Sequence, residues 1–194
     1  MDTLLNFSGG IDSTYCLYTY LKNNPKNKLL VHFIELNTPQ GRLEYEKKAV
    51  YNILNYLKLH SYTNFKFVTT KLDYGTLNYR VLDMYPISFF TGVVIRKFKD
   101  IKYVIQPLCL TELNWLNSSN PNRYLEMSAD REAIVNTVGK RKMEYLFPII
   151  KMTKHEVIKS LPKDLYQLVW YCRKPLGGKP CRDCHTCIQV KGAY

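Results

Sequence analysis

Apolar positions in the first part of the chain fall into short continuous runs separated by longer stretches of mixed polarity. Residues 3–7 and 29–36 form two such runs, which are typical of strands buried on both faces of a parallel sheet. Residues 13–21 have the length of a helix, and the Asn-Asn-Pro sequence at 23–25 favours a turn that ends it. This order predicts a β-α-β unit.

The same alternation continues along the chain. It predicts further helices at residues 43–59, 87–99 and 124–138, and further strands at 65–72 and 103–108. Strands that alternate with helices favour an α/β fold in which a doubly wound parallel sheet is covered on both faces. The polar residues 114–122 are predicted to form a loop near a functional site, because such loops commonly carry function.

Length and composition limit the organisation of the chain. With 194 residues, of which 46% are hydrophobic, the chain is long enough for one buried α/β core and too short for two catalytic domains. We expect a nucleotide-binding core at residues 1–150 and a C-terminal helix and cysteine tail at 151–194, packed on that core. Since no apolar run reaches the length of a membrane span and no secretion signal is evident, we expect a soluble, cytoplasmic protein without membrane partners.

The charge balance favours anionic ligands. The chain has 28 Lys and Arg residues against 16 Asp and Glu residues, a formal net charge of +12. Basic residues gather at 22–28, 96–99, 140–142 and 173–179. They are scattered over the sequence, so they are compatible with a nucleic-acid partner without favouring one, and they equally suit ATP or a solvated basic face.

A glycine-containing loop directly follows the first apolar run. Its residues are Ser8, Gly9, Gly10, Ile11, Asp12 and Ser13. Two glycines let the backbone approach a phosphate, and the N-terminus of the following helix points amides at the anion. A carboxylate at Asp12 repels phosphates unless it binds Mg²⁺ or caps the helix, so its presence indicates a magnesium-bound pyrophosphate. The alternative is an ordinary capped turn.

Four cysteines close to the C-terminus form a second pattern. Cys172, Cys181, Cys184 and Cys187 are spaced as C-x8-C-x2-C-x2-C. Four thiolates suit a closed tetrahedral Zn²⁺ site with a structural role, and a disulfide pair or chance clustering is the alternative. His185 lies between two of these cysteines and is more simply a neighbouring donor than a ligand. Cys16 fits a buried helix position, and Cys109 has no adjacent base that marks a nucleophile.

The Ser-Gly-Gly-x-Asp-Ser loop resembles the PP-loop of the N-type ATP pyrophosphatases, which transfer AMP to an oxygen and release pyrophosphate. The resemblance implies a PP-loop nucleotide-hydrolase fold that uses ATP and Mg²⁺. It assigns ATP binding to the loop residues Ser8, Gly9, Gly10, Asp12 and Ser13. Of these, Asp12 and Ser13 are the implied catalytic residues, and Phe33 and Asn37 at the end of the second strand would border the adenine.

Three segments together are similar to the 7-cyano-7-deazaguanine (preQ0) synthases, the QueC-like family of queuosine biosynthesis. They are the PP-loop, residues 147–158 with their Thr-Lys-x-Glu sequence, and the Trp-x-Cys at 170–172 that opens the cysteine motif. The family is a group of ATP-dependent ligases that join a 7-deazaguanine carboxylate to ammonia and form the amide and then the nitrile. The resemblance implies this substrate, ammonia as the second reactant, a structural Zn²⁺ and a possible homodimer.

The middle of the chain differs from that family. A Pro-x-Arg-Asn sequence is replaced by Pro-Ile-Ser-Phe at 86–89, and a Tyr-Pro-Asp-x-Arg loop is only echoed by Asn-Pro-Asn-Arg at 120–123. A changed substrate, or a reaction that stops at the amide, follows from these losses. Two alternatives therefore remain open: a PP-loop enzyme that modifies a nucleic acid or a protein terminus, and a nucleotide-binding module without turnover.

Overall fold

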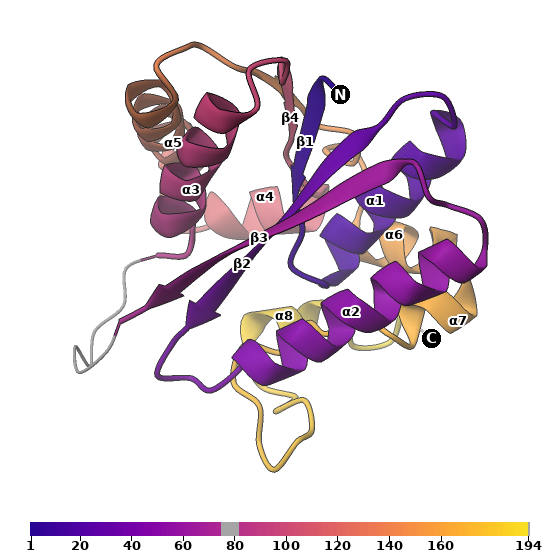
Figure 1. The fold of residues 1–194 in the computed structure, drawn as a ribbon. Coiled ribbons are helices and arrows are strands. Elements are labelled where there is room, and N and C mark those ends of the chain that lie inside the picture. The colour runs from indigo at the N-terminus through magenta and orange to yellow at the C-terminus, as the bar shows by residue number, and fades with distance from the viewer. Residues whose placement is uncertain (75–81, 194) are drawn as a thin grey trace.

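The computed structural model describes residues 1–74 and 82–193, and its centre is one parallel sheet (Figure 1). The five strands lie in the order β3-β2-β1-β4-β5, and every neighbouring pair is parallel. The strands are β1 (Thr3–Asn6), β2 (Leu29–Asn37), β3 (Phe65–Asp73), β4 (Tyr103–Ile105) and β5 (Glu144–Leu146). Since successive strands are added outward from β1 in both directions, the carboxyl ends of β1 and β4 flank the crevice where such sheets bind ligands.

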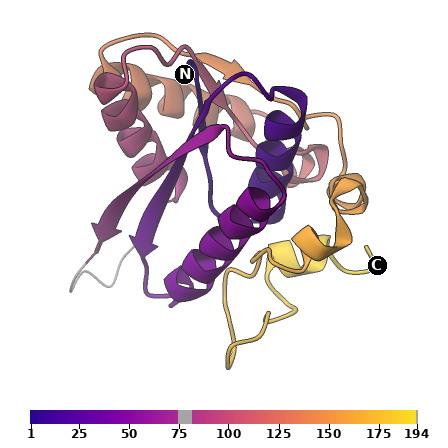
Figure 2. The ribbon, with the colours of Figure 1, turned by 45° about the vertical axis from the view of Figure 1, so that its right-hand side comes forward.

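Helices cover both faces of the sheet (Figures 1 and 2). The helices are α1 (Ile11–Asn23), α2 (Leu43–Leu59), α3 (Met84–Lys97), α4 (Leu110–Leu116), α5 (Arg123–Gly139), α6 (Lys154–Ser160), α7 (Lys163–Tyr166) and α8 (His185–Gln189). One face packs against α1, α2, α6 and α7, and the other against α3 and α5. The predicted doubly wound α/β fold with a parallel sheet is confirmed.

Alternation along the strands builds two separate cores. Leu5 and Val31 point into the larger core, where they meet apolar residues of α1, α2 and α6. Leu4 and Leu30, one residue earlier on each strand, point into the smaller core beneath α3 and α5. All four side chains are fully buried, which explains why these strands read as continuous apolar runs.

Several element boundaries differ from the expected ones. The first strand ends at Asn6, and the first helix already begins at Ile11, because the loop of residues 8–13, which we call the PP-loop after the motif that it resembles, continues directly into it. The third helix begins at Met84 rather than at 87, and β4 ends at Ile105 rather than at 108. The loop expected at 114–122 is shorter, because α4 extends to Leu116. The sequence patterns did not predict α4 or the three-residue strand β5.

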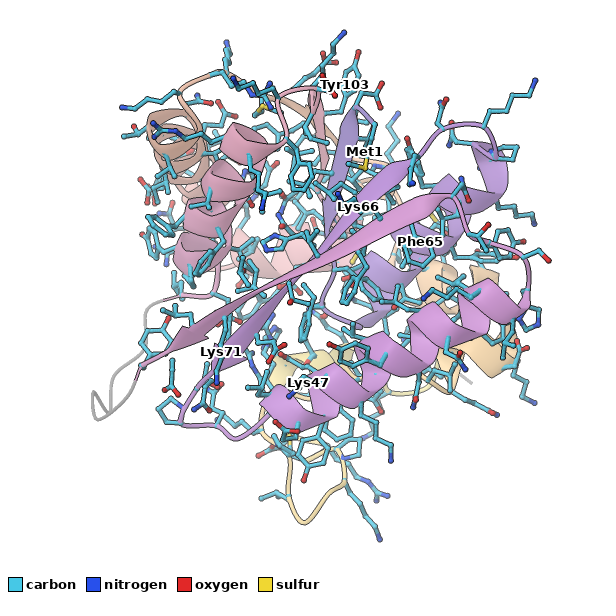
Figure 3. The ribbon with its side chains drawn as sticks, viewed as in Figure 1. Met1, Lys47, Phe65, Lys66, Lys71 and Tyr103 are labelled. Carbon is cyan, nitrogen blue, oxygen red and sulfur yellow. The ribbon has the colours of Figure 1, made fainter. Side chains whose placement is uncertain are left out.

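The outer strand β3 carries lysines along its length, including Lys66 and Lys71 (Figure 3). Lys66 lies over the ring of Phe98, with its Nζ 4.9 Å from the ring centroid. Positive charges on an edge strand oppose pairing with a second sheet, so they protect the one long edge that this fold leaves open.

The C-terminal segment folds back beside the start of α2 in both ribbon views (Figures 1 and 2). Val157 and Leu165 of this segment are fully buried in the same core as Leu5 and Leu17. Residues on both sides of position 150 therefore share one hydrophobic core. In the described ranges, none of the helices combines the length and apolarity needed to cross a bilayer.

Candidate active site and metal centre

The PP-loop is held by its own hydroxyls. Ser13 Oγ donates to the carbonyl of Gly10 at 3.2 Å and lies 3.3 Å from Ser8 Oγ. Gly9 has φ +71°, and a Cβ there would come within 3.1 Å of the Ala49 side chain, so the loop requires glycine at this position. Gly10 precedes α1 and provides no side-chain cap. The first amides of α1 are thus left for an anion, which the helix dipole also favours.

Asp12, in the first turn of α1, forms an ion pair with Lys154 at the start of α6. Both side chains are largely buried and line the same cavity. Burial raises the pKa of Asp12, and the ammonium of Lys154 opposes that rise. Burial by itself would lower the pKa of Lys154. The neighbouring Asp12 carboxylate outweighs this effect, so the pKa of Lys154 is raised overall. The second carboxylate oxygen, Asp12 Oδ1, is buried without a hydrogen-bond partner in the described part of the chain, which suits a cation ligand.

Lys154 is fixed by the cap of its own helix. Thr153 accepts from the amide of Glu156, and the Glu156 carboxylate accepts from the amide of Thr153, which completes a capping box. The amide of Lys154 donates to Thr111 Oγ1 at 2.8 Å. Sequence reasoning did not assign Lys154 a role. The signal was present in the Thr-Lys-x-Glu sequence, but Lys154 and Asp12 lie 142 positions apart in the sequence, so no local pattern revealed their contact.

The C-terminal segment also closes on the PP-loop directly. The amide of Trp170 donates to the carbonyl of Gly9 at 3.0 Å, and its indole Nε1 donates to the carbonyl of Cys172 at 2.9 Å. The Trp170 ring stacks on Tyr45 of α2, with centroids 4.6 Å apart. Trp170 therefore connects the glycine loop, through its backbone amide, to the first residue of the cysteine cluster, through its side chain.

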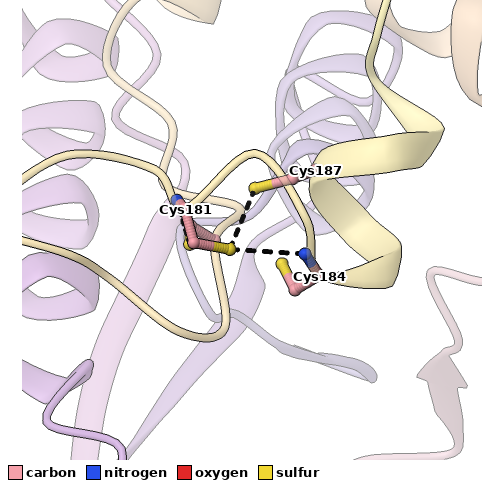
Figure 4. A group of neighbouring side chains, drawn as sticks. Cys181, Cys184 and Cys187 are labelled. Carbon is pink, nitrogen blue, oxygen red and sulfur yellow. Dashed lines mark hydrogen bonds between the residues drawn. The ribbon is translucent and has the colours of Figure 1, made fainter.

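The structure brings the four predicted cysteines together. Cys172, Cys181, Cys184 and Cys187 place their sulfurs within 4.8 Å of one another. Figure 4 shows Cys181 facing Cys184 and Cys187, and the sulfurs of Cys181 and Cys187 lie 3.9 Å apart. Since tetrahedral Zn–S bonds of about 2.3 Å set sulfurs about 3.8 Å apart, the arrangement fits one tetrahedral ion. All six cysteines of the chain are free of disulfides.

A cavity of about 730 Å³ extends from the PP-loop along the carboxyl edge of the sheet. Residues from both ends of the sequence line it, among them Asp12, Lys154 and Cys184. The cavity also reaches past β1 and β2 to the opposite face, where Thr91 of α3 and Arg131 of α5 contribute to its wall. Its size is within the range of small-molecule sites.

A row of uncharged side chains, joined to one another by hydrogen bonds, crosses the floor of the cavity. His32 Nδ1 donates to Asn6 Oδ1 at 3.0 Å, and Asn6 Nδ2 donates to Thr91 Oγ1 at 2.8 Å. On the other side, Thr70 Oγ1 donates to His32 Nε2 at 2.9 Å. Burial lowers the pKa of His32 to about 4, so the ring is neutral at physiological pH. Every member of the row then has a matched donor or acceptor.

A second set of polar side chains connects the cavity to the cysteine cluster. Glu112 of α4 accepts from Gln189 Nε2 at 3.1 Å and lies 3.8 Å from His185 Nε2. Burial would raise the pKa of Glu112, but its contacts with His185 and Gln189 produce a net decrease. The ring of His185 stacks on Trp115, with centroids 4.3 Å apart and planes 10° from parallel. Trp115 remains 47% exposed and lines the cavity, so it offers an aromatic surface there.

The cavity mouth near α2 contains an ion cluster. Asp83 accepts from Arg42 Nη2 at 2.6 Å and from Arg173 Nη1 at 3.0 Å. Glu46 lies 3.2 Å from Arg42 Nε, and burial raises the pKa of Glu46 to about 7 although Arg42 opposes the rise. Arg173 directly follows Cys172, so this cluster ties the C-terminal segment to α2 and α3.

The residues predicted to contact ATP are distributed as follows. Ser8, Gly10, Asp12, Ser13 and Phe33 line the cavity. Gly9 shapes the loop from behind, against Ala49 and Val50. Asn37 is exposed, does not belong to the described cavity lining, and donates to Asp73 of β3 at 3.1 Å. The assigned roles in ATP binding stay predictions.

Solved structures share this architecture. The U34-tRNA thiolase NcsA from Methanococcus maripaludis, a protein with a [4Fe-4S] cluster, aligns with a TM-score of 0.56 at 17% identity over 98% of this chain. NMN synthetase from Francisella tularensis aligns with a TM-score of 0.53 at 12% identity over 94% of this chain and 71% of the synthetase. The chain spans 64% of the thiolase's length. No protein-family model and no curated protein matches the sequence.

These likenesses establish the fold. The chain has the α/β fold that the thiolase and the synthetase also adopt, with a five-stranded parallel sheet. Its C-terminal segment holds a cluster of four cysteines whose geometry fits a metal ion.

Proposed function

We propose that this protein is an ATP-dependent enzyme that transfers AMP to an oxygen of its acceptor and releases pyrophosphate. The observation that carries the proposal is the buried Asp12, whose Oδ1 has no partner within the described residues. It lies at the start of α1, beside the ammonium of Lys154 and next to a glycine loop. A carboxylate, a cation and free helix amides at one point are what a magnesium-bound pyrophosphate requires.

Each group has a distinct role in this proposal. Asp12 would hold Mg²⁺, while the amides at the start of α1 and the hydroxyls of Ser8 and Ser13 would hold phosphate oxygens. Lys154 stabilises the negative charge that develops as pyrophosphate leaves. Mg²⁺, when bound, neutralises the phosphates. Because the site is largely buried, these charges act in a low dielectric and orient the reacting oxygen without covalent help from the protein.

Replacement of Asp12 tests this assignment. Asp12→Asn keeps the shape of the side chain and removes the charge that would hold Mg²⁺. We expect pyrophosphate release to fall by a factor of at least about 100. Asp100→Asn, at an exposed position, is the matched control and should retain full turnover. Unchanged pyrophosphate release in Asp12→Asn would remove the PP-loop assignment.

For the acceptor, we propose a 7-deazaguanine carboxylate, which joins ammonia to give an amide or the nitrile preQ0. The carboxylate oxygen attacks the α-phosphorus of ATP and pyrophosphate leaves; ammonia then attacks the carbonyl carbon, and AMP leaves with the oxygen. A second adenylation, now of the amide oxygen, releases another pyrophosphate, and the nitrile forms as AMP leaves with that oxygen and the nitrogen loses both of its protons. Trp115 offers a flat, half-exposed ring on which a planar base would stack, and the Glu112 carboxylate beside it would accept hydrogen bonds from the N–H groups of that base. Both features support this acceptor.

A direct assay tests the acceptor. Metal-loaded protein is incubated with 7-carboxy-7-deazaguanine, Mg-ATP and ammonium, and the products are followed by mass spectrometry. A nitrile supports the full reaction, and an accumulated amide limits the enzyme to the first half. If the free base yields neither product while AMP forms with another acceptor, the substrate is a different one and the adenylation chemistry stands.

For the cysteine cluster, we propose a structural Zn²⁺. A [4Fe-4S] cluster presents a separate iron to each thiolate and holds the sulfurs further apart than a single ion does, so the 4.8 Å limit favours zinc. Elemental analysis should find one zinc per chain. Cys184→Ser should lose the metal and unfold the segment around α8, since a structural zinc contributes folding free energy. Cys16→Ala, which removes a thiol outside the cluster, should keep the zinc.

A second candidate acceptor is a nucleic acid. The formal net charge of +12 and the half-exposed Trp115 on the cavity wall favour it, because basic surfaces and aromatic stacking both bind single-stranded bases. The thiolase that shares the fold is named for a tRNA position. Binding of tRNA that weakens steeply with salt, together with AMP release that requires tRNA, would favour this acceptor over the free base.

A further inference from the structure

Arg131 occupies a position where an apolar residue is expected. The buried residues of α5 are Arg131, Val135 and Gly139, which follow one another at intervals of four along a single face of the helix. Gly139 lets this face approach α3 closely, since a Cβ there would come 2.4 Å from Ile95 Cδ1. The arginine is therefore held in the packed interface between α5 and the sheet, and its side chain lines the cavity.

The guanidinium of Arg131 has few partners. It is 8% exposed, its Nη2 donates to Ser128 Oγ at 3.0 Å, and it lies over the Tyr145 ring at 4.6 Å. Its Nε is buried and has no hydrogen-bond partner among the residues that the structure describes. In residues 1–74 and 82–193, Arg131 forms no ion pair with a carboxylate.

The other two buried cations of the described chain are different. Lys154 is paired with Asp12, and Arg42 is paired with Asp83 and Glu46. Arginine stays charged at every accessible pH, so Arg131 cannot become neutral to escape the cost of burial. A buried charge without a counter-ion is costly to keep, and an anion bound in the cavity would supply the missing partner.

We propose that Arg131 binds an anionic group of the acceptor at the α3/α5 end of the cavity. The planar guanidinium, with its free Nε–H, fits the oxygens of a carboxylate or a phosphate. Ser88 and Thr91 of α3 line the same part of the cavity, and both hydroxyls donate to backbone carbonyls of their own helix. Because both hydroxyl hydrogens are used in these bonds, Arg131 is the charged donor that an anion would meet there.

This inference rests on the proposed function for the transfer of AMP to an acceptor and not for the free base as that acceptor, and the anion site itself depends on neither. The PP-loop and Arg131 reach the cavity from opposite faces of the sheet, so the group at Arg131 is separate from the oxygen that receives AMP. 7-Carboxy-7-deazaguanine has one acid group, and adenylation consumes it. The inference therefore favours an acceptor with a second acid, such as a phosphate on a nucleotide or an additional carboxylate.

Thermal unfolding with simple anions tests the site. The full-length, metal-loaded protein is first saturated with Mg²⁺ and the α,β-methylene analogue of ATP, which occupies the PP-loop and cannot release pyrophosphate. Inorganic phosphate or succinate is then added at constant ionic strength. At ten times its dissociation constant, a bound anion should raise Tm by about 3–6 °C. A larger rise with phosphate indicates a phosphate ester as the natural group, and a larger rise with succinate indicates a carboxylate.

Variants of Arg131 decide the assignment. R131M should lose the anion-dependent rise, and R131K, which keeps the charge without the planar fork, should reduce it severalfold. R131K also serves if R131M does not fold. R123M, an exposed position on the same helix, should respond as the unaltered protein does. An equal rise in R131M, or no rise with either anion in the unaltered protein, would overturn the proposal. The rise produced by the ATP analogue alone reports separately on the PP-loop.

Discussion

The two sides of the cavity treat buried polar groups differently. On the α1 and α6 side, Asp12 and Lys154 face each other as opposite charges although they lie far apart in sequence. On the α3 and α5 side, His32 is kept neutral within a hydrogen-bonded chain, and Arg131 has no carboxylate among the described residues. On the first side each buried charge has its counter-charge within the protein, whereas the second side leaves one charge for a ligand.

The difference matters because burial penalises each arrangement in its own way. An ion pair keeps both charges only while both partners are present, so the loss of one leaves a desolvated charge behind. A neutral hydrogen-bonded chain is cheap to bury as long as no member takes up a proton. The following changes test how far the two sides differ, beginning with the largest expected effect.

Removal of Lys154 should break the charged side. Lys154→Met leaves Asp12 buried without a counter-charge, so we expect the free energy of unfolding to fall by about 3–5 kcal/mol and pyrophosphate release to be lost. Chemical denaturation and the pyrophosphate assay measure both effects. Lys159→Met, exposed on the same helix, is the control. The double variant Lys154→Met/Asp12→Asn removes both charges and should recover much of the stability but no activity; if it is no more stable than Lys154→Met, the pair is not coupled.

The sequence predicted the central strands of the sheet better than the short elements beside them. Continuous apolar runs identified β1 and β2, because strands buried on both faces have a strong and unambiguous pattern. The strand β5 has only three residues with no buried position, and α4 has no buried residue at all, so neither carries a hydrophobic signal. Short elements of this kind are placed by their neighbours rather than by their own residues.

For the site, sequence reasoning found groups that are close together in the chain. The PP-loop and the cysteine cluster each depend on a local spacing that is visible in the sequence. Lys154 and Arg131 depend on contacts between distant elements, and their residue types alone do not distinguish them from exposed lysines and arginines. One feature of the sequence did mark Arg131: it lies four residues before Val135, as a charged residue on a helix face that is otherwise apolar.

Acid should weaken the neutral side through His32. Burial lowers the pKa of this fully buried ring from 6.5 to about 4, so the unfolded chain binds a proton more readily than the folded one. The stabilising effect of the neutral ring is complete above pH 6.5 and is lost as the pH falls towards 4, by about 3 kcal/mol in total. Denaturation at a series of pH values measures this slope. His32→Gln should flatten it and exposed His155→Gln should not; equal slopes in all three proteins would contradict the assignment.

On the side of the cavity with His32 and Arg131, the close packing of α3 against α5 should be the feature that is next most sensitive to substitution. A Cβ at Gly92 would come 2.6 Å from Val138 Cβ, so Gly92→Ala should cost about 1–3 kcal/mol of stability and loosen the helix that holds Arg131. The loss should be smaller when Val138→Ala is added, because the second change makes room for the new methyl group. A double-mutant cycle measures this coupling, and strictly additive losses would show that the two helices separate without strain.

The smallest expected effect concerns the side of the cavity with Asp12 and Lys154. Thr153→Ala removes the side-chain half of the capping box that starts α6, and we expect a loss of about 1 kcal/mol. Because Lys154 is the next residue and its amide also donates to Thr111, the ion pair with Asp12 should survive the change. Turnover should then fall much less than in Lys154→Met. Thr153→Ser restores the hydroxyl and should recover the stability, whereas a loss of activity as large as that of Lys154→Met would mean that the cap, rather than the packing of α6 on α1, positions the ammonium.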